Sequence, residues 1–235
     1  MPVAVVTGAS SGIGAELCRA LRGRGWLVVG MSRRPSRDAD EDEPCDVSER
    51  AAVEAVAARV LERHPRIGLV VNGAGIPGRH GFLDAPPELV EGVMRTNYLG
   101  SVWALRAFLP GLAPGSWVVN VVSVAGTVAD GPYSASKHAQ LCFSRALAFE
   151  LGRRGIAVLT VNPGYVETPG FPQRTRHSRL AGRLVVDPPL VVERILDGID
   201  RDRREIFVPR WYRPAMWIQA ALPGTIARAR ALRRR

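Results

Sequence analysis

The sequence predicts a single α/β domain in which a doubly wound parallel sheet lies between two layers of helices. Six short runs rich in Val and Ile alternate with longer amphipathic segments along the 235 residues. Most of the short runs show no polar–apolar alternation, which is typical of strands covered on both faces. Alternating strands and helices favour parallel pairing with right-handed crossovers, and so a three-layer α/β/α architecture.

The expected elements can be named in chain order. The strands are residues 3–8, 26–32, 67–73, 116–123, 156–164 and 205–208, and the helices are 12–24, 48–64, 88–110, 133–153 and 188–200. Segment 48–64 has the clearest start signal, because Ser48 is suited to an N-cap. One face of this helix carries Ala52, Val53, Val56, Ala57 and Val60. The acidic stretch 36–44 is expected to be a solvated loop.

Composition narrows the class of protein. The cysteines Cys18, Cys45 and Cys142 form no CxxC or Cys/His pattern, so we expect no metal site, no disulfide and a cytoplasmic location. We expect no secretory signal, and no apolar run is long enough to span a bilayer. Of the net charge of +10, residues 201–235 carry +8 and the rest of the chain +2. A whole-fold nucleic-acid role is therefore disfavoured.

The first expected strand ends in a glycine-rich turn, TGASSGIG, that opens the next helix. Gly8, Gly12 and Gly14 have no Cβ, which suits a tight turn. A helix N-terminus presents unpaired N–H groups and a partial positive charge, which suit a pyrophosphate. After the first strand of a βαβ unit, this pattern predicts a Rossmann-type dinucleotide site.

The glycine turn resembles the cofactor loop of the short-chain dehydrogenase/reductase family, and further motifs follow in the family's order. They are CDVSE, NGAG, NYLG, VVSVAG, YSASK and NPGYVET. The resemblance implies a single-domain NAD(P)-dependent oxidoreductase, with the part after about residue 205 outside the match. The cofactor-binding residues that it implies are Gly8, Ser10, Ser11, Gly12, Ile13, Gly14, Asp46, Val47, Asn72, Ala74, Gly75, Pro163, Gly164, Val166 and Thr168.

The end of the second strand bears on the choice of nicotinamide cofactor. In dinucleotide folds an acidic residue there binds both ribose hydroxyls, whereas Arg accommodates a 2′-phosphate. Here the strand ends in Ser32, and Arg33 and Arg34 follow. Because guanidinium pairs well with phosphate, the sequence predicts that NADP(H) is preferred over NAD(H). The alternative is that these are two surface residues in a chain with 31 arginines.

Lys137 is the only lysine in the chain, and Tyr133 lies four residues before it, on the same face of the expected helix. A nearby ammonium lowers the pKa of a phenol, which can then exchange a proton with a carbonyl or alcohol oxygen. The resemblance implies that both residues also contact the cofactor, Lys137 through the nicotinamide ribose. It further implies that Ser123 orients the substrate oxygen and that Asn97 holds a water in a relay to the lysine.

One spacing departs from the family's pattern. Ser123 and Tyr133 are ten positions apart, which is short for the family, so we expect a wider substrate pocket or a displaced serine. A catalytically weak cofactor-binding sensor or scaffold is therefore an alternative, as is a relative with epimerase or dehydratase chemistry. The basic segment 169–189 resembles the family's substrate lid, and either an anionic substrate or a solvated loop accounts for its charge.

The C-terminal end differs in composition from the rest. We divide the chain into a catalytic domain, 1–208, and a basic, aromatic tail, 209–235, expected to be helical. The tail suits a helix in a membrane interface, a cover over the substrate pocket, or a subunit contact. Its apolar residues favour a lipophilic substrate. The resemblance implies a homodimer or homotetramer formed through the long helices.

Overall fold

The computed structural model describes residues 1–78, 80–128, 130–174, 182, 184–222, 224 and 228. The expectations for residues 175–181 and 183 of the basic segment, and for most of the tail after residue 222, fall outside these ranges. Within the described part of the chain, none of the helices is both long and apolar enough to cross a bilayer.

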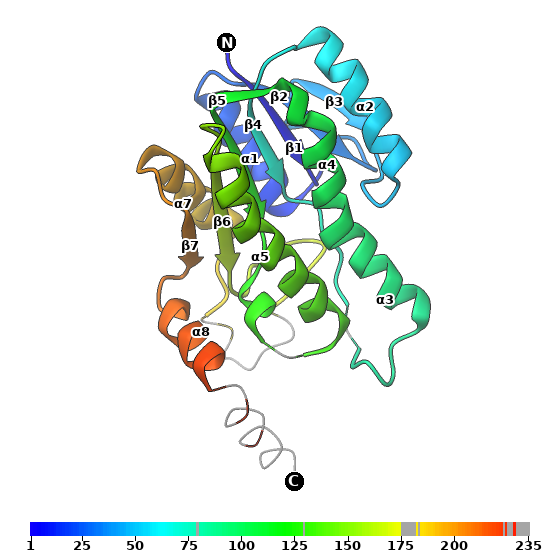
Figure 1. Cartoon of the computed structure of the whole chain (residues 1–235). Helices are drawn as coiled ribbons and strands as arrows, with labels where there is room; N and C mark the ends of the chain where they lie inside the picture. The colour runs from blue at the N-terminus through cyan, green and yellow to red at the C-terminus, as the bar shows by residue number, and fades with distance from the viewer. Residues whose placement is uncertain are drawn as a thin grey trace.

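The described residues form one seven-stranded parallel sheet with the order β3-β2-β1-β4-β5-β6-β7 (Figure 1). The strands are β1 (Val3–Thr7), β2 (Leu27–Ser32), β3 (Glu41–Pro44), β4 (Ile67–Asn72), β5 (Leu112–Val121), β6 (Ala157–Pro163) and β7 (Glu205–Val208). The main helices are α1 (Gly12–Gly23), α2 (Arg50–Arg63), α3 (Pro87–Val93), α4 (Gly100–Phe108), α5 (Gly131–Gly152), α7 (Pro188–Asp200) and α8 (Tyr212–Ala221). The described residues also form three short helical segments: η1 (Met94–Leu99), η2 (Leu109–Gly111) and η3 (Val124–Thr127).

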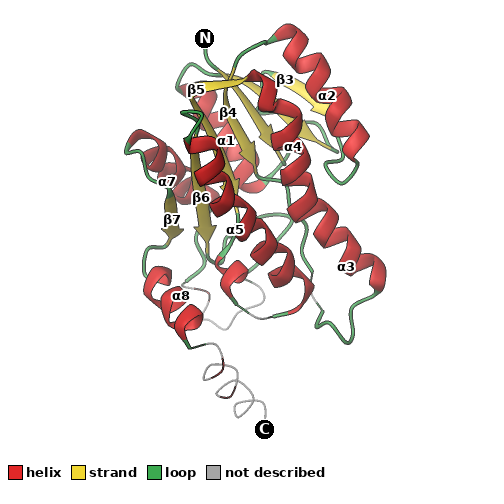
Figure 2. Cartoon of the chain, in the orientation of Figure 1, coloured by secondary structure: helices red, strands yellow, loops and turns green. Residues whose placement is uncertain are grey.

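Helices cover both faces of the sheet, which confirms the predicted doubly wound, three-layer architecture (Figure 2). Along β1, Val3 and Val5 pack under α2, α4 and α5, while Ala4 and Val6 pack under α1 and α7. Both sets of side chains are buried, which explains why the strand sequences show no polar alternation.

The acidic stretch 36–44 is not wholly a solvated loop, because residues 41–44 form the edge strand β3. Glu43 is buried there and accepts hydrogen bonds from Arg59 and Arg63 of α2, each at 2.7 Å. Glu41 pairs with Arg63 and His64. The prediction was wrong because these charges are neutralised by a helix that follows in the sequence, and local composition does not reveal that pairing.

Helix α2 begins later than predicted, and Ser48 does not cap it. The Asp46 carboxylate accepts a hydrogen bond from the Ser48 N–H at 2.9 Å, and the Asp46 carbonyl accepts one from the Glu49 N–H at 3.0 Å. This local turn delays the first helical residue to Arg50. Of the predicted apolar face, Val53, Val56, Ala57 and Val60 are buried, and Ala52 is half-buried against the core.

The predicted helix 88–110 is helical but not uniform. A π-helical turn, η1, separates α3 from α4, and the fully buried Asn97 lies on it. Single π-helical turns inside α-helices occur frequently at functional sites, because the extra residue turns a side chain off the regular helical face.

Within the described part of the tail, helix α8 packs against the domain. Tyr212 and Met216 of α8 are buried in a small cluster with Phe207, against Val124 and Val128 at η3. This contact brings the C-terminal helix to the edge of the sheet where the strands end (Figure 1).

Candidate active site

The carboxyl ends of the parallel strands open into a cavity of about 1080 Å³. Ligand sites of open α/β sheets lie at this edge because the strand-to-helix loops converge there. The cavity is lined by all but two of the predicted site residues: Gly8, Ser10, Ser11, Gly12, Ile13, Gly14, Ser32, Arg33, Arg34, Asp46, Val47, Ala74, Gly75, Ser123, Tyr133, Lys137, Pro163, Gly164, Val166 and Thr168. The two exceptions are Asn72 and Asn97.

The glycine loop forms a cradle that side chains would fill. Gly8 and Gly12 have φ values of +73° and +57°, which L-residues with a Cβ rarely adopt. A Cβ at Gly14 would lie 2.2 Å from the Gly8 carbonyl oxygen. The loop therefore presents its backbone and the N-terminus of α1 to the cavity, and it fits the pyrophosphate of a nicotinamide dinucleotide.

Thr7 ties this loop to the end of β4. Its hydroxyl donates to the Val71 carbonyl at 3.2 Å and accepts from the N–H groups of Gly73 and Ala74 at 3.1 and 3.3 Å. One side chain thus fixes the spacing between two of the segments that line the cavity.

Asn72 does not reach the cavity, although we expected it to contact the cofactor. It is 1% exposed, and its amide N–H donates to the Asn120 side-chain oxygen on β5 at 2.7 Å. Asn120 in turn donates to Ser144 of α5 at 2.9 Å. This pairing places the Asn72 side chain beneath the sheet edge, where it links β4 to β5.

The end of β2 brings two guanidinium groups to the rim of the cavity. Arg34 donates to the Ser11 hydroxyl at 3.4 Å, and Arg33 lies 3.8 Å from the Asp46 carboxylate. Ser32 is buried and donates a hydrogen bond to the Arg34 carbonyl, which holds the chain in a turn. Both arginines are exposed, so they can turn toward an anionic ligand.

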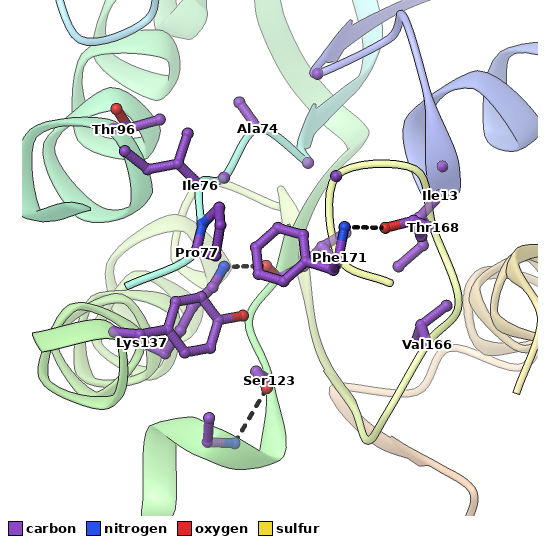
Figure 3. A pocket seen from close by; sticks show the side chains of 18 of the residues that line it. Ile13, Ala74, Ile76, Pro77, Thr96, Ser123, Lys137, Val166, Thr168 and Phe171 are labelled. Carbon is purple, nitrogen blue, oxygen red and sulfur yellow. Dashed lines mark hydrogen bonds between the residues drawn. The ribbon is translucent and has the colours of Figure 1, made fainter. Parts of the chain in front are cut away.

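Ser123 and Tyr133 meet at the bottom of the cavity despite their short spacing. The residues between them include the single 3₁₀ turn η3, and the Ser123 hydroxyl accepts from the Ala125 N–H at 3.1 Å (Figure 3). Burial raises the pKa of Tyr133 to about 12, and its hydrogen bond with Ser123 partly offsets that rise. The tight turn therefore keeps the serine next to the tyrosine, and the expected displacement is not seen.

Lys137 is buried beside them. Burial lowers its pKa to about 7, and its ammonium nitrogen lies 6.0 Å from the centre of the Tyr133 ring. In this structure the pKa of Tyr133 is set by burial and by Ser123, so the lowering by Lys137 that the sequence suggests stays a prediction.

Asn97 uses its side chain to hold the segment that follows β4. Its oxygen accepts from the Ile76 N–H at 2.8 Å, and its nitrogen donates to the Ile76 carbonyl at 3.1 Å. The same nitrogen donates to the Ser136 hydroxyl at 3.0 Å. Asn97 thus fixes Ile76, which lines the cavity, relative to α5.

The sequence profile described as short chain dehydrogenase matches residues 2–179. The chain belongs to the short-chain dehydrogenase family. A putative ketoacyl reductase of Streptomyces coelicolor is 38% identical over 186 residues, which cover 71% of each chain. The protein is therefore an oxidoreductase that acts on CH–OH and C=O groups.

Solved structures agree with this membership. A short-chain dehydrogenase of Streptomyces avermitilis superposes with a TM-score of 0.79 at 26% identity, covering 98% of this chain and 97% of that one. A variant of actinorhodin polyketide ketoreductase, crystallised with NADPH, gives a TM-score of 0.75 at 30% identity, covering 87% of this chain and 94% of that one.

Short-chain dehydrogenase motifs do not reveal the other end of the cavity. It is lined by Val124, Val128, Phe171, Tyr212 and Met216. The Phe171 and Tyr133 rings are 5.7 Å apart, and Tyr212 lies so close to Gly164 that a Cβ there would be 2.2 Å from its ring. The aromatic composition of the tail was the available signal, and two residues of α8, Tyr212 and Met216, line the cavity.

We expect Gly14→Ala to weaken dinucleotide binding by about tenfold or more and to lower the melting temperature. The added Cβ would overlap the Gly8 carbonyl, and relieving such overlap costs about 1–3 kcal/mol. Gly23→Ala at the other end of α1 is the control, because a Cβ there meets nothing within 4 Å. NADPH titration and thermal unfolding measure both effects; equal binding by the two variants would contradict the cradle.

Proposed function

We propose that this chain is an NADP(H)-dependent reductase that interconverts a lipophilic ketone or aldehyde and the corresponding alcohol. The observation that carries the proposal is the Ser123–Tyr133 pair, which lines the same cavity as the glycine loop. When bound, the nicotinamide supplies the hydride. The protein binds, orients and exchanges the proton.

In this proposal, Tyr133 is the acid–base residue. With its pKa raised by burial, the phenol holds its proton at neutral pH and can donate it to a carbonyl oxygen as negative charge develops there. Ser123 donates a second hydrogen bond to that oxygen and orients it. Lys137 contacts the nicotinamide ribose, and Asn97 acts through Ile76 by holding the wall of the cavity.

We assign the other predicted cofactor-binding residues to successive parts of the dinucleotide. The loop Gly8–Gly14 takes the pyrophosphate, Asp46 and Val47 the adenine, and Ala74 and Gly75 the adjoining ribose. The nicotinamide carboxamide is taken by the loop after β6, through Pro163, Gly164, Val166 and Thr168. Asn72 supports this arrangement indirectly, through its bond to β5.

A preference for NADP(H) is supported by charge at the ribose end. Arg34 reaches Ser11 and Arg33 lies beside Asp46, so both guanidinium groups flank the end of β2. Ser32 leaves that position without the carboxylate that would repel a 2′-phosphate. The NADPH bound to the actinorhodin ketoreductase agrees with this preference.

A lipophilic substrate is supported by the lining of the end distant from the glycine loop. Val124, Val128, Phe171, Tyr212 and Met216 place aliphatic, aromatic and thioether groups there, beside the polar Gln173. Such a wall offers apolar contact and few partners for the hydroxyls of a polyol. The ketoacyl reductases among the relatives act, by name, on substrates with an acyl chain, which fits this lining.

We further propose that the outer face of α8 contacts an anionic membrane surface, with the protein otherwise cytoplasmic and a homodimer or homotetramer. Trp211, Trp217 and Ile218 are 47%, 62% and 55% exposed, and Arg213 stacks over Trp217 at 4.9 Å. The net +8 of residues 201–235 complements anionic lipid. Phe82 and Leu83, in the loop beside the cavity, are also exposed.

We expect Tyr133→Phe to lower kcat/KM for carbonyl reduction by about 10²–10⁴-fold, because the proton donor is lost. The phenyl ring still packs on Phe171, so the Kd for NADPH should stay within about threefold of wild type. Tyr98→Phe is the control, since Tyr98 does not line the cavity. A ketone and aldehyde panel followed by NADPH absorbance supplies the assay, and an active Tyr133→Phe enzyme would refute the assignment.

Arg34→Ala should lower kcat/KM with NADPH by about 10- to 100-fold, the worth of one charge-assisted hydrogen bond to phosphate, and leave the value with NADH unchanged. The nearby exposed Arg37→Ala, outside the cavity, should change neither. Steady-state kinetics with NADPH and NADH test this preference. A wild-type enzyme that uses NADH as well as NADPH would overturn the proposed preference.

For the membrane contact, the full chain should sediment with anionic vesicles at low salt and remain in solution with zwitterionic ones. Trp217→Ala should reduce the bound fraction severalfold, because an interfacial aromatic is lost. Phe149→Ala, which removes an even more exposed aromatic side chain from α5, should not reduce the bound fraction. Wild-type protein that stays in solution with anionic vesicles would rule out the contact.

A further inference from the structure

Gln140 lies one helical turn after Lys137 on α5 and is 0% exposed. Its side-chain oxygen accepts a hydrogen bond from the Lys137 ammonium at 2.8 Å. The Val121 carbonyl of β5 accepts a second one at 3.0 Å. An ammonium has three protons, so two are held by the protein and one remains for the cavity that Lys137 lines.

The glutamine is itself held in one orientation. Its amide nitrogen donates to the Ser101 hydroxyl at 2.8 Å, and that hydroxyl donates to the Asn97 carbonyl at 3.2 Å. A flipped amide would turn its N–H₂ group toward an ammonium that can only donate, and both groups would lose a partner. The chain Lys137–Gln140–Ser101–Asn97 therefore has a single consistent direction.

We propose that Gln140 is a positioning residue: it holds the Lys137 ammonium in place for the reaction and favours its charged form. The inference rests on the proposed role of Lys137. The family resemblance implies a water between the lysine and Asn97. In this structure, the side chains of Gln140 and Ser101 connect Lys137 to the Asn97 backbone carbonyl. No motif or spacing in the sequence assigns this role to Gln140.

The effect on the lysine follows from its surroundings. The groups that face the amine are Gln140 and Tyr133 on α5, the Val121 carbonyl on β5, and the uncharged Asn97 on η1. Burial, with no contribution from a carboxylate among the described residues, is what lowers the pKa of Lys137. The oxygen of Gln140 opposes that effect, because a hydrogen bond accepted from the ammonium stabilises the charged form.

The single lysine makes a direct test available. Full-length protein grown with ¹³Cε-labelled lysine, on a tag free of lysine, gives one lysine side-chain resonance by NMR. We expect the midpoint of the Lys137 titration to fall by about one pH unit in Gln140→Leu and to rise by about one pH unit or more in Gln140→Glu. Ser144→Ala is the control, because Ser144 is equally buried on α5 but bonds to Asn120 and Thr160 instead.

The pH dependence of kcat should shift in the same directions as the pKa of Lys137. Where the charged lysine is required, activity falls as pH rises through its pKa. The alkaline limb of the kcat profile therefore moves to lower pH in Gln140→Leu and to higher pH in Gln140→Glu. If Gln140 had a purely structural role, both variants would change the maximal kcat but leave the pH of the alkaline limb unchanged.

The outcomes separate the two proposals. If the lysine midpoint is the same in wild type, Gln140→Leu and Gln140→Glu, Gln140 does not act on Lys137, even in an active enzyme. If the midpoints shift as expected but no carbonyl substrate is reduced by the wild type, the proposed function fails and the lysine–glutamine link stands. Should Gln140→Leu not fold, the nearly isosteric Gln140→Glu carries the comparison.

Discussion

The burial of a primary amine is the constraint around which the centre of this protein is organised. Lys137 is 4% exposed, and a charged or neutral amine removed from water needs hydrogen-bond acceptors in place of it. A carbonyl of β5 and a side chain of α5 supply them, and the second is anchored to the helix that carries Asn97. Strand β5 and helices α5 and α4 are thereby joined around the amine.

The parallel sheet explains why residues so far apart in sequence share one cavity. Because every strand runs the same way, the loops after β1, β2, β4, β5 and β6 all open at one edge. Thr7 and Asn72 then lock neighbouring strand ends by side-chain hydrogen bonds. The cavity is a property of the sheet edge, whereas the chemistry comes from the few polar groups placed on it.

Much of this could be predicted from the sequence, since the relevant signals are local. The glycine turn, the Tyr133–Lys137 spacing and the unalternating strands each depend on adjacent residues. What the sequence could not predict are partners distant in sequence: Glu43 pairs with Arg63, and the Asn72 side chain bonds to Asn120. Gln140 looks like an ordinary polar residue of a helix until the fold brings Ser101 beside it.

Helix α8 has two faces with different surroundings. Tyr212 and Met216 form part of the cavity wall, and Trp217 on the same short helix faces outward. The Tyr212 ring also packs closely against Gly164, in the loop after β6. A displacement of α8 by anything that binds its outer face would therefore change the width of the cavity. In the proposed arrangement, contact of α8 with a membrane surface and the width of the substrate end of the cavity would therefore be coupled.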